Sequence, residues 1–84
     1  MGGASRMKPQ RLGEKLLAVR RKFDYSLSQM ANALSSDQVK IPRTDVSRFE
    51  KNQREPSLIV LLRYARLAGV TMETLVDDDL ELKI

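Results

Sequence analysis

The sequence of 84 residues contains no cysteine and no histidine. The first absence excludes disulfides and thiolate metal sites, and the second removes the commonest metal ligand and the commonest general base. No apolar run approaches the roughly 18 residues that a membrane-spanning helix needs, and the N-terminus lacks the apolar stretch of a secretory signal. We therefore expect a cytoplasmic protein without a metal, a cofactor or a membrane anchor.

What the chain does have is charge of both signs, unevenly distributed. The net charge is +4, and hydrophobic residues make up 42% of the chain, as is typical of one small globular domain. Residues 1–54 carry twelve Lys/Arg against five Asp/Glu, whereas residues 55–84 carry three against six. A basic half suits an anionic partner such as nucleic acid, although a solvated surface gives the same pattern.

The apolar periodicity predicts an all-α fold, a compact bundle of five short helices. The expected helices cover approximately residues 10–22, 26–34, 42–50, 58–67 and 71–76. In the first helix Leu12, Leu16 and Val19 share one inward face, and Lys15 is expected on the outer surface with Arg21 and Lys22. The fourth helix is apolar over most of its surface, so we expect it in the middle of the bundle.

Cap residues mark the helix boundaries. Ser26 and Gln29 have the spacing of a capping box, and Ser57 and Thr71 precede the fourth and fifth helices. Asn52 and Gly69 stand where a left-handed residue ends a helix.

Three segments are expected along the chain. Residues 1–9 are expected to be a flexible N-terminal arm, residues 10–77 the domain and residues 78–84 a C-terminal tail. The acidic run Asp77–Asp79 is expected to be a solvated end to the last helix.

Several short motifs occur together in a fixed order. They are Ser26-x-x-Gln-Met-Ala, Arg43-x-x-Val-Ser-Arg-Phe-Glu, Arg54-Glu-Pro-Ser and Ala68-Gly-Val. In this order and spacing, residues 12–76 resemble the lambda-repressor-like, Cro/CI or XRE-type helix-turn-helix family. The resemblance implies a sequence-specific double-stranded DNA-binding regulator, a repressor, of bacterial or phage origin and associated with the nucleoid. It further implies a homodimer on a pseudo-palindromic operator.

The third expected helix carries the candidate base-reading residues. The apolar Val46 and Phe49 would anchor it, leaving a polar face for the major groove, which admits one α-helix. By resemblance, the residues that face the bases are Arg43, Thr44, Ser47 and Arg48. Arginine is the bidentate partner of guanine, while serine and threonine meet several base edges. The alternative is an ordinary solvated helix face.

Two helix ends and one loop are candidate phosphate sites. Ser26 caps the second helix, whose first amides, at Leu27, Ser28 and Gln29, are expected to be free to bind a phosphate. The loop after the third helix adds Lys51, Asn52, Gln53 and Arg54. Residues 35–41 form a longer connection than in relatives, which could add a backbone contact through Lys40, shift the third helix or be a neutral insertion.

Arg20 and Glu50 match an arginine and a glutamate that pair in the family. The resemblance implies a partly buried ion pair with a structural role, which orients the third helix.

The surface of the expected dimer is left open. The last helix and the tail supply apolar candidates, for which core packing is the alternative: Met72, Leu75, Val76, Leu80, Leu82 and Ile84.

Two other functions fit parts of the sequence. A protein-interaction module could use the acidic C-terminal part. An enzyme is not expected, because no nucleophile and base are paired and the Asp77–Asp79 run is more typical of a solvated cap than of a metal site.

Overall fold

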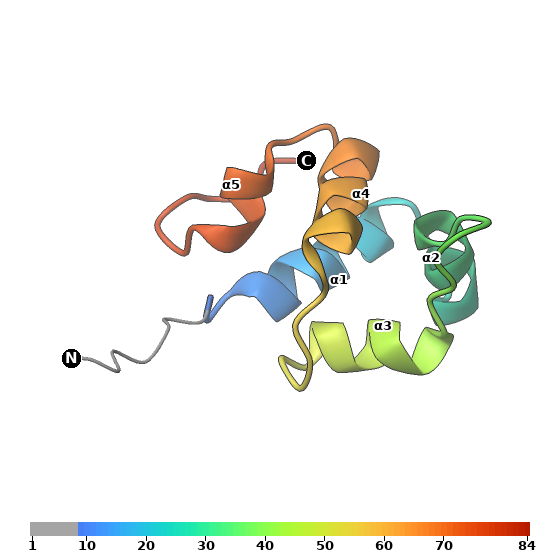
Figure 1. The fold of residues 1–84 in the computed structure, drawn as a ribbon. Helices are drawn as coiled ribbons and strands as arrows, with labels where there is room; N and C mark the ends of the chain where they lie inside the picture. Colours follow the sequence, from blue (N-terminus) through green and yellow to red (C-terminus); the bar gives the residue numbers. More distant parts are fainter. Residues whose placement is uncertain (1–8) are drawn as a thin grey trace.

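The computed structural model describes residues 9–84, which fold into five α-helices (Figure 1). The helices are α1 (Leu12–Lys22), α2 (Leu27–Leu34), α3 (Arg43–Glu50), α4 (Leu58–Ala68) and α5 (Met72–Val76). Within this range no residue belongs to a strand. The predicted all-α fold of five short helices is confirmed, while most of the expected arm, residues 1–8, lies outside the described residues.

Local capping chemistry sets where the helices begin and end. At α2, the hydroxyl of Ser26 accepts the amide of Gln29 at 3.1 Å and the Gln29 side chain accepts the amide of Ser26 at 2.8 Å. This is the predicted capping box, and Ser57 and Thr71 cap α4 and α5 through their own hydroxyls. Gly69 ends α4 with a φ of 73°, a conformation that costs glycine nothing.

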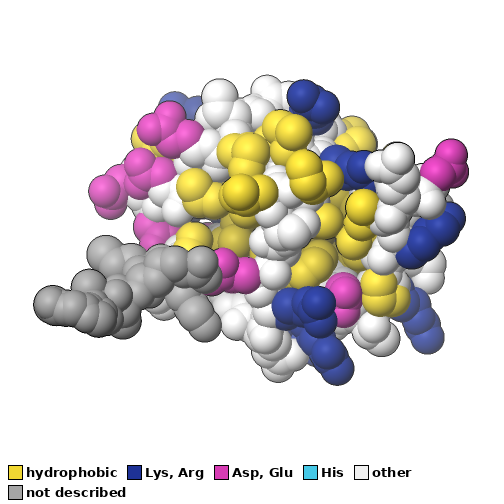
Figure 2. All heavy atoms as spheres, viewed as in Figure 1, with side chains coloured by type: hydrophobic (Ala, Val, Ile, Leu, Met, Phe, Trp, Pro, Cys, Tyr) yellow, Lys and Arg dark blue, Asp and Glu magenta, His cyan; other side chains and the backbone are white. Residues whose placement is uncertain are grey.

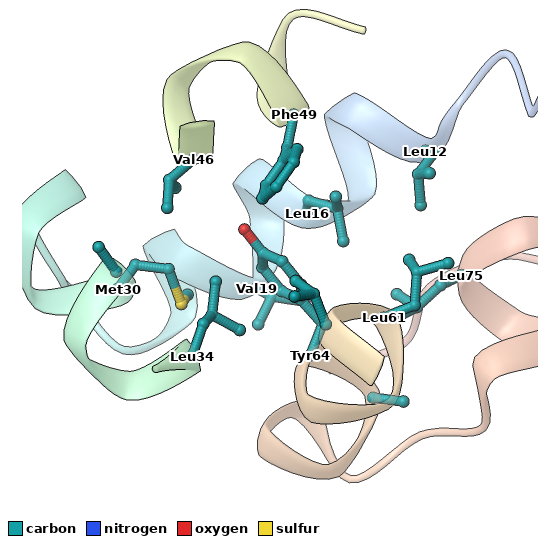
Figure 3. Close-up of a cluster of buried hydrophobic side chains, with 13 residues drawn as sticks. Leu12, Leu16, Val19, Met30, Leu34, Val46, Phe49, Leu61, Tyr64 and Leu75 are labelled. Carbon is teal, nitrogen blue, oxygen red and sulfur yellow. The ribbon is translucent and has the colours of Figure 1, made fainter. Parts of the chain in front are cut away.

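The core lies between α1, α4 and the pair α2 and α3, with α5 covering one end (Figures 1 and 3). Its largest fully buried side chains are Tyr64, Leu16, Met30, Leu34, Leu75, Val19 and Val46. Leu75 is thus a core residue, which removes it from the candidates for a dimer surface. Each of these side chains contributes about 1.5–3 kcal/mol by leaving water, which is a large share of the margin of a small domain.

Helix α4 departs from the expectation that it lies wholly in the middle of the bundle. Its inner face is buried through Leu61, Tyr64 and Ala65, but in its first turn Leu58 is 74% exposed and Ile59 53% exposed. In the same turn Val60 and Leu61 are buried, 2% and 7% exposed, so the exposed pair lies on the outer face of the helix start. Figure 2 shows the hydrophobic side chains that gather over this helix.

Lys15 is buried, and the prediction that it lies on the outer surface is wrong. Only 2% of the residue is exposed. Its ammonium donates to three backbone carbonyl oxygens, those of Thr74 at 2.9 Å, Asp77 at 2.8 Å and Leu80 at 2.8 Å. Because all three donors of the ammonium are used, the charge is accommodated without a carboxylate partner. The contacts attach the end of α5 and the following turn to α1.

The segment after α5 caps the start of α1. That helix has no side-chain cap of its own. Instead the carboxylate of Asp78 accepts the amides of Gln10 at 2.8 Å and Arg11 at 2.9 Å, and Arg11 forms an ion pair with Glu81 at 3.0 Å. Leu82 packs against the core. Asp78 is therefore half-buried and bonded, in contrast to the solvated end expected for the acidic run.

We expect acid to weaken this attachment first. The backbone hydrogen bonds from Gln10 and Arg11 lower the pKa of Asp78 below its ordinary value of 3.8. A carboxyl with a lowered pKa contributes stability that is present above 3.8 and is lost as the pH falls through the folded-state pKa. Asp78→Asn should lower stability at pH 7 and flatten its decline below about pH 4, as measured by urea unfolding. Asp79→Asn is the matched control, and equal pH profiles for the two variants would contradict the role of Asp78.

The hydroxyl of Tyr64 is buried without a hydrogen-bond partner among the described residues. Tyr64 is fully buried, and its oxygen points toward the space between Val46, Phe49 and Leu16 (Figure 3). Burial raises the pKa of this hydroxyl, so it stays protonated. An unsatisfied buried hydroxyl costs free energy that the aromatic ring has to offset.

Tyr64→Phe should therefore leave stability unchanged or raise it by up to about 1 kcal/mol, because the ring stays and only the unpaired hydroxyl is lost. Chemical denaturation measures this change. Leu16→Ala serves as the reference for a damaging core change and should cost about 2–5 kcal/mol. A loss above about 1 kcal/mol in Tyr64→Phe would show that the hydroxyl has a partner, such as a buried water.

Candidate nucleic-acid interface

Helix α3 turns an apolar stripe inward and a polar stripe outward. Val46 and Phe49 are buried in the core, 0% and 3% exposed, and point away from the free side of the helix (Figure 3). Arg43, Thr44 and Arg48 are exposed and Ser47 is half-buried. In Figure 1 the helix lies along the lower edge of the molecule, where no other element covers it. The four candidate base-reading side chains thus lie on the face of α3 that does not meet the core.

Basic and acidic side chains gather on different parts of the surface, as they do along the sequence. Figure 2 shows acidic side chains gathered at the left, over α5 and the segment after it, and basic side chains projecting at the right and along the lower edge, where α3 lies. The exposed face of α3 is therefore on the basic side of the molecule, as an interface with phosphates requires.

Arg20 joins three helices at one point. Its guanidinium binds the two carboxylate oxygens of Glu50 at 2.7 and 3.0 Å, and it also donates to the carbonyl of Tyr25 at 3.0 Å. The Glu50 side chain is only 8% exposed and that of Arg20 20%. The hydrogen bond with Glu50 raises the pKa of Arg20, so the cation persists. One side chain of α1 thus positions the last residue of α3 and the residue before the Ser26 cap of α2.

The loop after α3 is attached to the start of α1. Asn52 has a φ of 57°, the predicted left-handed conformation. Its side chain accepts the amide of Gly13 at 2.9 Å and donates to the carbonyl of Gln10 at 3.4 Å. A Cβ atom at Gly13 would lie 2.6 Å from the carbonyl oxygen of Glu50, so only glycine allows this approach. The Asn52 side chain is thereby used for positioning, and its backbone amide donates to the carbonyl of Phe49 at 3.2 Å, so both are engaged in contacts within the protein.

The other residues of this loop are exposed. Arg54 lies 3.8 Å from Asp45 of α3 in a loose ion pair, in which the Arg54 side chain remains 56% exposed. The amide of Gln53 donates to the carbonyl of Arg48 at 2.9 Å. Lys51 has an exposed side chain. The loop is thus fixed to the end of α3 by its backbone while two cations point outward, an arrangement suited to phosphate contacts.

The start of α2 offers two free amides and not three. The prediction that the Gln29 amide is free is wrong, because this amide donates to the Ser26 hydroxyl within the capping box. In the part of the chain that the structure describes, the amides of Leu27 and Ser28 have no partner. The Leu27 side chain packs against the core, and Ser28 is exposed. These two amides, with the positive end of the α2 dipole, form a site suited to an anion.

The longer connection 35–41 is an ordered loop. Ser36 and Val39 exchange backbone hydrogen bonds at 2.7 and 3.3 Å. The Ser35 hydroxyl donates to the carbonyl of Ala31 at 2.8 Å and accepts the amide of Ile41 at 2.9 Å. These bonds close the loop and carry the chain directly into α3. Lys40 is exposed near the end of the loop.

The described residues include no group of three His, Cys, Asp or Glu side chains that could hold a metal ion. Nor does any helix between residues 9 and 84 have the length and apolar character of a membrane span.

A Helix-turn-helix family model matches residues 16–75, which include all of α2, α3 and α4. The chain belongs to the Cro/CI, XRE-type helix-turn-helix family. The family is one of DNA-binding transcriptional regulators and is generally non-enzymatic. No curated protein and no solved structure matches the chain.

In a helix-turn-helix family, the buried contacts of α3 and its exposed polar face have distinct roles. Val46, Phe49, Glu50 and Asn52 fix α3, and the sequence-predicted base-reading residues remain outside. The positioning contacts of Gly13 and of the Asn52 side chain could not be predicted, since neither residue type signals a contact between segments 39 residues apart.

Removing either member of the Arg20–Glu50 pair should destabilise the fold. Arg20→Ala and Glu50→Ala should each lower the free energy of unfolding by about 1–3 kcal/mol, because each leaves a mostly buried charge without its partner. The double variant should lose less than the sum of the two, as a double-mutant cycle measured by urea unfolding will show. The exposed pair Arg11–Glu81 is the control, for which no measurable coupling is expected. Additive losses at Arg20 and Glu50 would contradict this role.

Proposed function

We propose that the protein is a sequence-specific transcriptional repressor that reads the major groove of duplex DNA with α3. The observation that carries the proposal is the two-sided character of this helix within a helix-turn-helix chain. Its apolar side chains are held in the core, whereas four polar side chains on its outer face have no partner among the described residues: Arg43, Thr44, Ser47 and Arg48. Repression needs only occupancy of the operator, whereas activation needs a further contact with the transcription machinery. The proposal includes action on bacterial or phage DNA in the cytoplasm, in association with the nucleoid.

The reading residues form two neighbouring rows on α3. Arg43 and Ser47 are one turn apart, as are Thr44 and Arg48, so all four face the same groove. We assign bidentate contacts with guanine to the arginines, and contacts with base edges or a thymine methyl group to Thr44 and Ser47. Within residues 9–84 none of these side chains has a hydrogen bond or an ion pair that DNA would have to break.

Backbone phosphates would be held on both sides of α3. The amides of Leu27 and Ser28 at the start of α2 form one clamp, with Ser26 and Gln29 maintaining the cap. The side chains of Lys51, Gln53 and Arg54 form the other, with Asn52 holding this loop in place. Lys40 adds a contact at the start of α3. Such contacts fix the register of the protein on the duplex without reading its sequence.

We further propose that the protein binds a pseudo-palindromic operator as a homodimer. One α3 contacts only a few base pairs, so two copies are needed for a specific site. Apolar side chains exposed outside α3 are available for such a contact: Leu58, Ile59, Val76, Leu80 and Ile84.

Fluorescence anisotropy with duplexes selected from a random pool tests the proposal. Arg43→Ala should lose discrimination at one or two base pairs by about 1–3 kcal/mol, because it removes a bidentate base contact. Lys51→Ala should weaken binding to all duplexes alike and reduce the salt slope by about 1. Arg21→Ala, which removes an exposed charge from α1, is the control and should do neither.

Two results would overturn the proposal. If no sequence is enriched, the protein does not read DNA. If Arg43→Ala behaves as Lys51→Ala does, α3 contacts only phosphates.

A further inference from the structure

A second candidate site lies between the end of α2, the loop after it and the second half of α4. It is an open groove of about 370 Å³, within the size range of small-molecule sites. The groove is lined by Ala33, Ser35, Ser36, Arg63, Arg66 and Leu67. None of these residues belongs to α3, to the loop 51–54 or to the start of α2, so the groove is separate from the proposed DNA-reading surface.

Hydrogen-bond donors converge on this groove without acceptors to match them. Arg63 is held in place by one nitrogen, Nη1, which donates to the carbonyl of Leu34 at 2.7 Å. Its other guanidinium nitrogens, and all those of Arg66, have no partner among the described residues. Nor does any acidic side chain line the groove. Two cations one turn apart therefore share one opening with nothing of opposite charge beside them.

Ser36 adds a third donor. Its hydroxyl oxygen accepts the amides of Gln38 at 3.3 Å and Val39 at 3.2 Å, which uses both of its lone pairs. The hydroxyl hydrogen remains to donate. Ser35 differs, because its hydroxyl already both donates to Ala31 and accepts from Ile41. The groove thus offers one oriented hydroxyl and two guanidinium groups to a ligand that only accepts.

We propose that this groove binds a small organic anion, with a phosphate or carboxylate group held by Arg63, Arg66 and Ser36. Guanidinium groups match the geometry of both anions through paired hydrogen bonds. The apolar side chains of Ala33 and Leu67 also line the groove and would contact the carbon skeleton of the ligand. These two side chains distinguish such a ligand from inorganic phosphate, which has no apolar part to bury.

A ligand bound in the groove would affect α3 through the loop 35–41. A ligand that joins Arg66 of α4 to Ser36 restrains residues 35–41, which run directly into α3. The ligand would thereby change DNA affinity, and this consequence rests on the proposed function. The binding site itself does not, because it can be tested without DNA.

Phenyl phosphate is a suitable probe, since it combines a phosphate dianion with an apolar ring. In a titration of the DNA-free protein followed by amide NMR, we expect saturable shifts at Ser36 and Arg66 with a dissociation constant of about 1 mM. Arg66→Gln should weaken binding about tenfold by removing charged hydrogen bonds, and Arg66→Lys by less, since it keeps the charge. Arg21→Gln, an equal charge change on another face, should leave the affinity unchanged.

Several outcomes would overturn the site. Absence of saturable shifts excludes it, and equal losses in Arg66→Gln and Arg21→Gln reduce it to diffuse ion attraction. Inorganic phosphate binding as tightly as phenyl phosphate would exclude a role for the apolar side chains of Ala33 and Leu67. A salt slope of DNA binding lowered by about 1 in Arg66→Gln would assign the groove to the DNA backbone. If DNA binding fails altogether but the probe binds, the site stands and only the proposed function falls.

Discussion

The arrangement of the helices depends on the guanidinium of Arg20. It is the point at which α1, the end of α3 and the turn before α2 meet, through Glu50 and the carbonyl of Tyr25. A helix as short as α3, with eight residues, is not stable alone and takes its orientation from its neighbours. Apolar contacts at Val46 and Phe49 hold it against the core but are non-directional, whereas two charged hydrogen bonds at its last residue fix its rotation.

The start of α1 is a second joint, and it draws together parts of the chain that are far apart in sequence. Asp78 supplies the cap that α1 lacks, and Asn52 brings the loop after α3 to Gly13. Lys15 attaches the turn after α5 one helical turn further along. The two joints act on opposite ends of α1, so this helix sets where both the proposed DNA-reading surface and the C-terminal segment lie.

The features that the sequence predicts well are those with local causes. The box at Ser26 and Gln29, the left-handed Asn52 and Gly69, and the inward stripe of α3 each follow from residues a few positions apart. Lys15 is in helical register with Leu12 and Val19, on the inward face, but its residue type predicts the surface, because a buried ammonium needs partners that the local sequence does not show. Its burial depends on three carbonyls about 60 residues away, a fact of tertiary structure. The cap that Asp78 provides for α1 could not be predicted for the same reason, since nothing in an acidic run indicates a contact with a distant helix end.

The residues that fix α3 and the residues proposed to read DNA are separate sets. Val46, Phe49, Glu50 and Asn52 are committed to contacts within the protein, while the side chains of Arg43, Thr44, Ser47 and Arg48 have no hydrogen bond or ion pair among the described residues. Exposed positions of this kind tolerate substitution at little cost in stability. The proposed specificity can therefore change independently of the fold, because a new set of outward side chains would still be presented by the same buried contacts.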